Sequence, residues 1–160
     1  MACRIRFAGP DDAHAIHAFI VALATYEREP EAVEVTPDIL RAQMTVPRPP
    51  FECLLAELAG APVGFALFFY NYSTWRGRAG IYLEDLYVDE AHRGRGVGKA
   101  LLRRLAGVAV ERGCARLEWA ALDWNANAIG FYERLGAEAQ RRWILFRLTD
   151  EPLARLAAAG

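Results

Sequence analysis

Apolar residues alternate with polar ones, or run together briefly, along several short segments of the chain. Such patterns are typical of half-buried and buried β-strands. They predict strands over residues 3–8, 51–58, 62–73, 80–88, 115–122 and 142–148. Only three small residues separate the second segment from the third, so these two segments are expected to form a hairpin.

Apolar residues spaced three or four apart predict helices over residues 10–26, 37–44, 97–112, 125–135 and 151–158. Pro10 suits the first turn of the first helix, and Thr36 before a proline is a typical N-cap of the second. Gly113 and Gly136 are expected to end the third and fourth helices.

The predicted order is a strand, two helices, three strands, then helix, strand, helix and strand, and a short terminal helix. An antiparallel meander joined to a half in which strands and helices alternate is typical of a mixed sheet with helices on both faces. We therefore expect an α/β (α+β) fold in a single domain over residues 1–160.

Composition and charge argue against nucleic acid and membrane partners and favour a reducing compartment. The chain has 19 basic and 20 acidic residues and a formal net charge of −1, which disfavours binding to nucleic acid. No apolar run is long enough for a membrane span, and the first residues lack the apolar core of a signal peptide. Cys3, Cys53 and Cys114 are odd in number and far apart, which is typical of reduced thiols in a cytoplasmic protein.

A glycine-rich turn, HRGRGVGKA, joins a predicted strand to a predicted helix. It is not a Walker A loop, because Gly94 and Gly98 enclose three residues instead of four and Ala100 replaces the hydroxyl residue. A dinucleotide fingerprint fails because its third glycine position is Lys99. Two interpretations remain: a helix N-terminus whose amides bind a pyrophosphate, or a plain loop with solvated arginines.

The run YLEDLYVDEAHRGRGVGKALL resembles the core motif of the GCN5-related N-acetyltransferase (GNAT) superfamily, in which the turn reads Arg/Gln-x-x-Gly-x-Gly/Ala. Downstream, DWNANAIGFYERLGA resembles the second motif of that superfamily. The segments YLEDLYV, LDWN and LATYERE are similar to the diamine branch, which contains spermidine/spermine and thialysine acetyltransferases. The resemblance implies the GNAT fold, with a mixed sheet of six to seven strands that splay at the cofactor site.

The resemblance also implies acetyl-coenzyme A as donor and a primary amine as acceptor, with no metal. The pyrophosphate is expected on the turn amides, and the pantetheine arm is expected to pair with the preceding strand. The implied cofactor contacts are Leu86, Tyr87, Val88, Arg93, Gly94, Arg95, Gly96, Val97, Gly98, Lys99, Asn125 and Ala128. Asn125 has a second, compatible interpretation as a helix N-cap.

Direct attack on a thioester requires a neutral amine, and an amine of pKa about 10.4 is neutral in only about one molecule per thousand at pH 7. The resemblance implies Tyr132 as the general acid for the leaving thiolate, and Glu84 as a base acting through water and as an anchor for the amine. The alternatives are a packed tyrosine and a structural ion pair.

Asp85 is the weaker candidate, since adjacent residues of a strand point to opposite faces unless a bulge intervenes. By alternation, Glu84 is expected to share a face with Tyr82, Leu86 and Val88.

The resemblance implies that an acceptor amine is surrounded by carboxylates and aromatic rings. The candidates are Tyr26, Glu27, Trp75, Glu84, Glu118 and Trp119. The chain departs from the polyamine enzymes at Ser73, where they have an acid, and at Arg141 and Arg142, which replace acidic residues. Fewer acids and more arginines favour an amino acid with its own carboxylate over a polycation.

Three functions therefore stand as hypotheses. The first is an acetyl-CoA-dependent N-acetyltransferase for a small primary amine (a diamine, a polyamine or a lysine-like amino acid), working in a ternary complex. The second changes the acceptor to a protein or peptide amine, and the third is a non-catalytic acyl-CoA-binding module. A homodimer is expected, without nucleic acid or membrane partners.

Overall fold

The computed structural model describes residues 3–159. The chain divides into two compact units, residues 1–120 and 121–160, and each is described by itself. The expectation of a single domain stays a prediction.

The first unit carries the sheet and three helices. Its elements are β1 (Arg4–Phe7), α1 (Ala13–Tyr26), α2 (Pro37–Thr45), β2 (Glu52–Leu58), β3 (Ala61–Ser73), β4 (Arg78–Val88), α3 (Val97–Glu111) and β5 (Leu117–Glu118), with 3-10 turns at Pro10–Asp12, Pro30–Ala32 and Glu90–His92. The second unit contains α4 (Ala126–Arg134) and α5 (Asp150–Ala158). As predicted, Thr36 caps α2 by accepting a hydrogen bond from the Ile39 amide.

The strands lie in the order β1-β2-β3-β4-β5, so each strand pairs with its neighbour along the chain. The first three pairings are antiparallel and the β4–β5 pairing is parallel. The long β3–β4 ladder, from Gly64↔Val88 to Ser73↔Arg78, forms the centre of the sheet. The mixed sheet that the sequence predicts is thereby confirmed.

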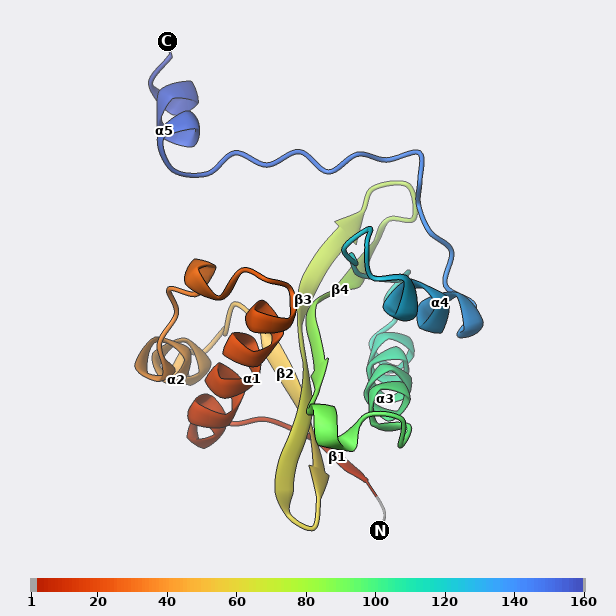
Figure 1. Ribbon diagram of the computed structural model, residues 1–160. Helices are drawn as coiled ribbons and strands as arrows, with labels where there is room; N and C mark the ends of the chain where they lie inside the picture. The colour runs from red at the N-terminus through yellow and green to blue at the C-terminus, as the bar shows by residue number, and fades with distance from the viewer. Residues whose placement is uncertain (1–2, 160) are drawn as a thin grey trace. The chain divides into compact units, whose positions relative to one another are not determined.

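Helices cover both faces of this sheet, with α1 and α2 on one face and α3 on the other (Figure 1). On the α1 face, Ile16 and Phe19 pack against Leu55 and Phe65 in one buried cluster. The α3 helix packs against β2, β3 and β4, and its Leu101 is fully buried. Burial of these apolar side chains stabilises the fold by roughly 1.5–3 kcal/mol per large residue.

The number of strands differs from the expected six to seven, because the described residues form five. Residues 142–148, predicted as a strand, pair with no other segment of the described chain, and Trp143, Ile144, Leu145 and Phe146 are 72–88% exposed. A strand needs a hydrogen-bonding neighbour, and the 121–160 unit offers only two helices. The predicted strand 115–122 shortens to Leu117–Glu118 for a related reason, since only Ile81 and Tyr82 pair with it.

Gly64 pairs with Val88 where β3 packs tightly against the end of β4. A Cβ added there would lie 2.7 Å from the carbonyl oxygen of Tyr87, which is main chain and cannot swing away. We expect Gly64→Ala to lower the free energy of unfolding by about 1–3 kcal/mol in urea denaturation. The control is Gly9→Ala, where the added Cβ meets nothing within 4 Å and φ is −116°. Equal midpoints for the two variants would contradict this account.

Candidate active site

The glycine turn leads into α3 with the backbone geometry of an anion-binding loop. Gly94 and Gly96 have φ of +74° and +79°, in the left-handed region that favours glycine. Gly96 is the N-cap of α3, and no side chain caps the helix there. The amides of the first turn therefore have no intrahelical acceptor, and the helix dipole adds partial positive charge at the same place. Exposed Arg95 and Lys99 add cationic side chains to this turn.

Arg93, the first residue of the motif, contacts the rest of the protein through a hydrogen bond and two aromatic rings. Its Nε donates to the carbonyl oxygen of Val88 at 2.9 Å. Its guanidinium carbon lies 5.0 Å from the centre of the Tyr26 ring and 5.3 Å from that of Tyr87. These contacts join the turn to the end of β4 and to the last residue of α1.

The sheet opens beside the turn. The parallel ladder between β4 and β5 consists of two pairs, Ile81↔Leu117 and Tyr82↔Glu118, whereas β4 continues to Val88. From residue 83 onward, β4 has no strand on its β5 side among the described residues. The splayed sheet implied by the resemblance is thus present, and Leu86, Tyr87 and Val88 lie on its open edge.

A β-bulge at Glu84 changes the faces predicted for this strand. Leu67 pairs with Asp85 and Phe68 pairs with Leu83, so Glu84 is an extra residue in the ladder. The simple alternation that grouped Glu84 with Tyr82, Leu86 and Val88 is therefore wrong, because a bulge shifts the register by one residue. It also removes the reason for setting Asp85 aside, since an intervening bulge lets neighbouring side chains serve one site.

Glu27, Glu84 and Asp85 lie close enough to interact electrostatically. Burial, together with the smaller effects of the Glu84 and Glu27 charges, raises the pKa of Asp85 to about 6. Burial, followed by the charge of Glu84, also raises the pKa of Glu27. The packing of α1 against β4 brings the three residues together. A cation is favoured here, and a carboxylate with a pKa near 6 is suited to accept a proton at neutral pH.

The other predicted acceptor residues are more scattered. Tyr26, beside Glu27, is 40% exposed and stacks on Arg93. Trp75 lies in the β3–β4 turn, 90% exposed, at the opposite end of β4 from Val88. The structure therefore gathers Tyr26 and Glu27 with Glu84 and leaves Trp75 apart.

Glu118 and its neighbour Trp119 stand at the end of β5. The Glu118 carboxylate accepts a hydrogen bond from Asn71 at 3.1 Å and forms an ion pair with Arg116 at 2.7 Å. Trp119 is half-buried. Ser73, at the position where the polyamine enzymes have an acid, is buried, and its hydroxyl accepts from the Arg76 amide.

Asn125 and Tyr132 belong to the second unit. The Asn125 side chain caps α4 by accepting from the amide of Ala128 at 3.3 Å, so its interpretation as an N-cap is confirmed. Tyr132 lies on α4 with its ring centre 5.4 Å from that of Phe131.

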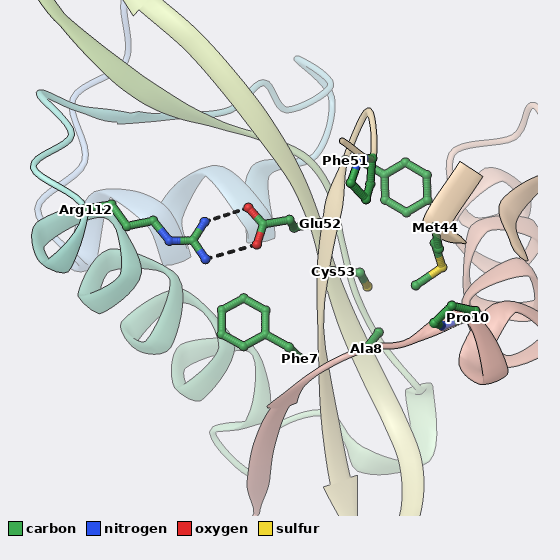
Figure 2. Close-up of a pocket in the computed structure, with 9 residues that line it drawn as sticks. Phe7, Ala8, Pro10, Met44, Phe51, Glu52, Cys53 and Arg112 are labelled. Carbon is green, nitrogen blue, oxygen red and sulfur yellow. Dashed lines mark hydrogen bonds and ion pairs between the residues drawn. The ribbon is translucent and has the colours of Figure 1, made fainter. Parts of the chain in front are cut away.

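A cavity of about 240 Å³ lies elsewhere in the first unit (Figure 2). Its lining residues are Phe7, Ala8, Pro10, Met44, Pro49, Phe51, Glu52, Cys53 and Arg112. Arg112 holds Glu52 through two hydrogen bonds of 2.6 and 3.0 Å, and burial raises the pKa of the Cys53 thiol. None of the predicted site residues lines this cavity, and its protonated thiol is a poor nucleophile.

Residues 3–159 carry neither a metal-binding cluster nor a membrane-spanning helix. No group of three or more His, Cys, Asp or Glu side chains there is arranged to hold a metal ion, and His17 instead contacts the Val35 carbonyl at 3.0 Å. Within the same residues, no helix combines the length and the apolar character needed to cross a bilayer.

The pKa of Asp85 predicts a pH dependence of stability. Because its folded pKa of about 6 exceeds the usual 3.8, the folded state keeps a proton that the unfolded state has lost. This group therefore stabilises the fold as pH falls from 7 towards 4, and ionised Asp85 costs roughly 2–3 kcal/mol at pH 7.5. We expect Asp85→Asn to raise the free energy of unfolding at pH 7.5 and to have a smaller effect at pH 5, as measured by urea denaturation.

The matched control is Asp123→Asn in the exposed segment before α4, which should change stability little at either pH. An Asp85→Asn protein with the same pH dependence as wild type would contradict the assignment.

Comparison with known proteins agrees with this geometry. The sequence profile of the acetyltransferase (GNAT) family matches residues 13–137. A thialysine N-epsilon-acetyltransferase from Bos taurus is 38% identical over 164 residues, covering 96% of each chain. An L-ornithine N5-acetyltransferase from Arabidopsis thaliana is 47% identical over 90 residues, covering 56% of this chain and 40% of that protein.

The fold has a solved counterpart in an integron cassette protein from V. cholerae, with a TM-score of 0.83, 23% identity and 99% coverage of both chains. At that identity the likeness shows the fold alone. The family profile covers most of the chain, and the full-length relatives carry the same kind of name. The chain therefore belongs to the GNAT family of N-acetyltransferases and is an enzyme of the acyltransferase class.

Proposed function

We propose that this protein transfers the acetyl group of acetyl-coenzyme A to the side-chain amine of a small amino acid, by direct attack in a ternary complex. One observation carries the proposal: two carboxylates at a bulge of β4, joined by Glu27 from the end of α1, precede an open edge of the same strand, which leads into an uncapped, glycine-rich helix N-terminus. An amine site and a site for an elongated, phosphate-bearing donor are thus adjacent in the chain.

The residues of the turn fit the donor. The amides of Gly94–Lys99 would bind the pyrophosphate, and the free edge of Leu86–Val88 would pair with the pantetheine amides. Bound acetyl-CoA supplies the activated thioester. A backbone N–H of the open edge, from Leu86 or Val88, would polarise the thioester carbonyl. Asn125 and Ala128 would add contacts from α4.

The carboxylates would prepare the acceptor. Glu84 and Glu27 stabilise the ammonium form as the amine arrives, and Glu84 takes up its proton through water. Asp85, with its pKa of about 6, is a second proton acceptor in the same cluster. Tyr132 would donate its hydroxyl proton to the leaving thiolate.

The class of acceptor follows from charge and from the relatives. Thialysine and L-ornithine, the acceptors in the names of two relatives, are amino acids that end in a primary amine. Arg141 and Arg142 are exposed cations that suit a substrate carboxylate and repel a polyamine. A protein amine is the alternative acceptor. The presence of both Glu84 and Tyr132 argues against a non-catalytic module.

An amine panel tests this proposal. With acetyl-CoA as donor, we expect thiol release with thialysine, ornithine and lysine, and slower release with spermidine and with peptides. Release with peptides alone would favour the protein-acetyltransferase alternative. Absence of release with every amine, in a protein that binds coenzyme A, would favour the binding module.

Variants in the same assay assign the roles. Tyr132→Phe removes the proton donor and should lower kcat about tenfold or more, while Glu84→Gln should lower kcat/KM and shift its pH profile. The control is Glu118→Gln, which alters a carboxylate already held by Asn71 and Arg116 and should leave the pH profile unchanged. Wild-type turnover in Tyr132→Phe would overturn the role of the hydroxyl.

We also propose that the protein acts in the cytoplasm as a homodimer. Cys3, Cys53 and Cys114 are free, which suits a reducing compartment. Residues 142–148 expose Ile144 and Phe146, and β5 is an edge strand. In a two-fold dimer, pairing of these segments between the two copies would cover the exposed apolar residues of 142–148 and the free edge of β5.

Light scattering after size exclusion tests the dimer. We expect roughly twice the 17.8 kDa chain mass for wild type and a shift to monomer for Phe146→Glu. Phe146 is 88% exposed in the single chain, so the substitution costs an isolated copy little. Val110→Glu, at an apolar residue 80% exposed on α3, is the control and should stay dimeric. A monomeric wild type would overturn the proposal.

A further inference from the structure

Arg93 contacts two aromatic rings that come from different elements. Tyr26 ends α1 and Tyr87 belongs to β4, and the guanidinium carbon is 5.0 and 5.3 Å from the two ring centres. Both distances fall within the range of about 6 Å over which a cation is attracted to a ring face. The one guanidinium therefore contacts both rings, one from α1 and one from β4.

One of these rings is anchored in the core. Tyr87 lies 6.0 Å from Phe19, measured between ring centres, and Phe19 stacks on Phe65 at 5.5 Å. Phe65 is fully buried in the central strand β3. Contacts between the rings of Phe65, Phe19 and Tyr87 hold Tyr87 against the core. Arg93 connects Tyr87 to Tyr26 at the surface.

A hydrogen bond adds a third connection. Arg93 Nε donates to the carbonyl oxygen of Val88, the last residue of β4, at 2.9 Å. Gly94, the residue after Arg93, is where the left-handed turn begins. The side chain of Arg93 therefore clamps the end of the open strand immediately before the anion-binding turn.

We propose that Arg93 is a positioning residue that couples the two substrate sites, instead of serving as a counter-charge for phosphate. Through Val88 it holds the strand and turn expected to bind the donor, and through Tyr26 it holds the α1 end where Glu27 joins the acidic cluster. This inference rests on the proposed acetyltransferase function.

Two substitutions of Arg93 separate positioning from counter-charge. Lysine keeps the charge but has no planar group and no Nε donor at the position of the bond to Val88. We expect Arg93→Lys and Arg93→Gln each to raise the amine KM and the coenzyme A Kd, by roughly five- to tenfold. Coenzyme A binding is measured by calorimetry without the amine. A counter-charge predicts instead that lysine restores binding and that the amine KM does not change, and that result would overturn the proposal.

Arg95→Gln is the matched control, because Arg95 is an exposed arginine of the same turn. It should raise the coenzyme A Kd, with an effect that shrinks in high salt, and leave the amine KM unchanged. If Arg93→Gln gives this same pattern, Arg93 is a counter-charge. Arg103→Gln, on the exposed side of α3, should leave both constants unchanged.

A second variant keeps the test valid if Arg93→Gln does not fold. Tyr26→Leu removes one of the two ring faces and should raise the amine KM, and the double variant with Arg93→Lys should be less than additive. Full additivity would overturn the coupling. A wild-type protein that binds no coenzyme A would overturn the proposed function itself, whereas normal wild-type binding with unaffected Arg93 variants would overturn only the positioning role.

Discussion

The unequal pairing of β4 with its two neighbours is the constraint on which the site depends. β4 pairs with β3 along its length but with β5 at only two positions. The first ladder fixes β4 in the middle of the sheet, and the early end of the second leaves its last residues with an open edge. Because the glycine turn follows directly, the open edge and the uncapped start of α3 form one continuous stretch of backbone. In the proposed function, that stretch of backbone would bind a long donor with amides and a pyrophosphate through main-chain groups.

The carboxylates at the bulge lower the stability of the folded protein when they are ionised. Glu84 is the extra residue of β4, and Asp85 faces the core cluster under α1, where burial raises its pKa to about 6. Neighbouring carboxylates repel one another, so the cluster is less stable when all three are ionised. An incoming ammonium relieves that repulsion. In the proposed function, the electrostatic repulsion that destabilises the free protein would therefore favour binding of the acceptor amine, as is common at functional sites.

Most of the first unit could be predicted from the sequence because its signals are local. Local sequence accounts for the apolar faces of α1 and α3, for the cap at Thr36 and for the glycine turn. The bulge at Glu84 could not be predicted, since it is a mismatch in register between the paired strands β3 and β4 and leaves no mark in strand composition. Nor could the contacts of Arg93 with both Tyr26 and Tyr87 be predicted, since these two residues are 61 positions apart in the chain. Residues 142–148 have the composition of a strand, but composition does not supply a partner.

The sequence by itself determined the family, the mixed α/β fold and the glycine turn before a helix, because motif spacing and periodicity are properties of short segments. Only the tertiary structure decided that Glu27 joins Glu84 and Asp85, that the alternation of β4 breaks at residue 84, and that Arg93 contacts strand and rings. These are contacts between elements distant in the chain. They depend on strand register and on the packing of α1 against β4, which no local pattern encodes.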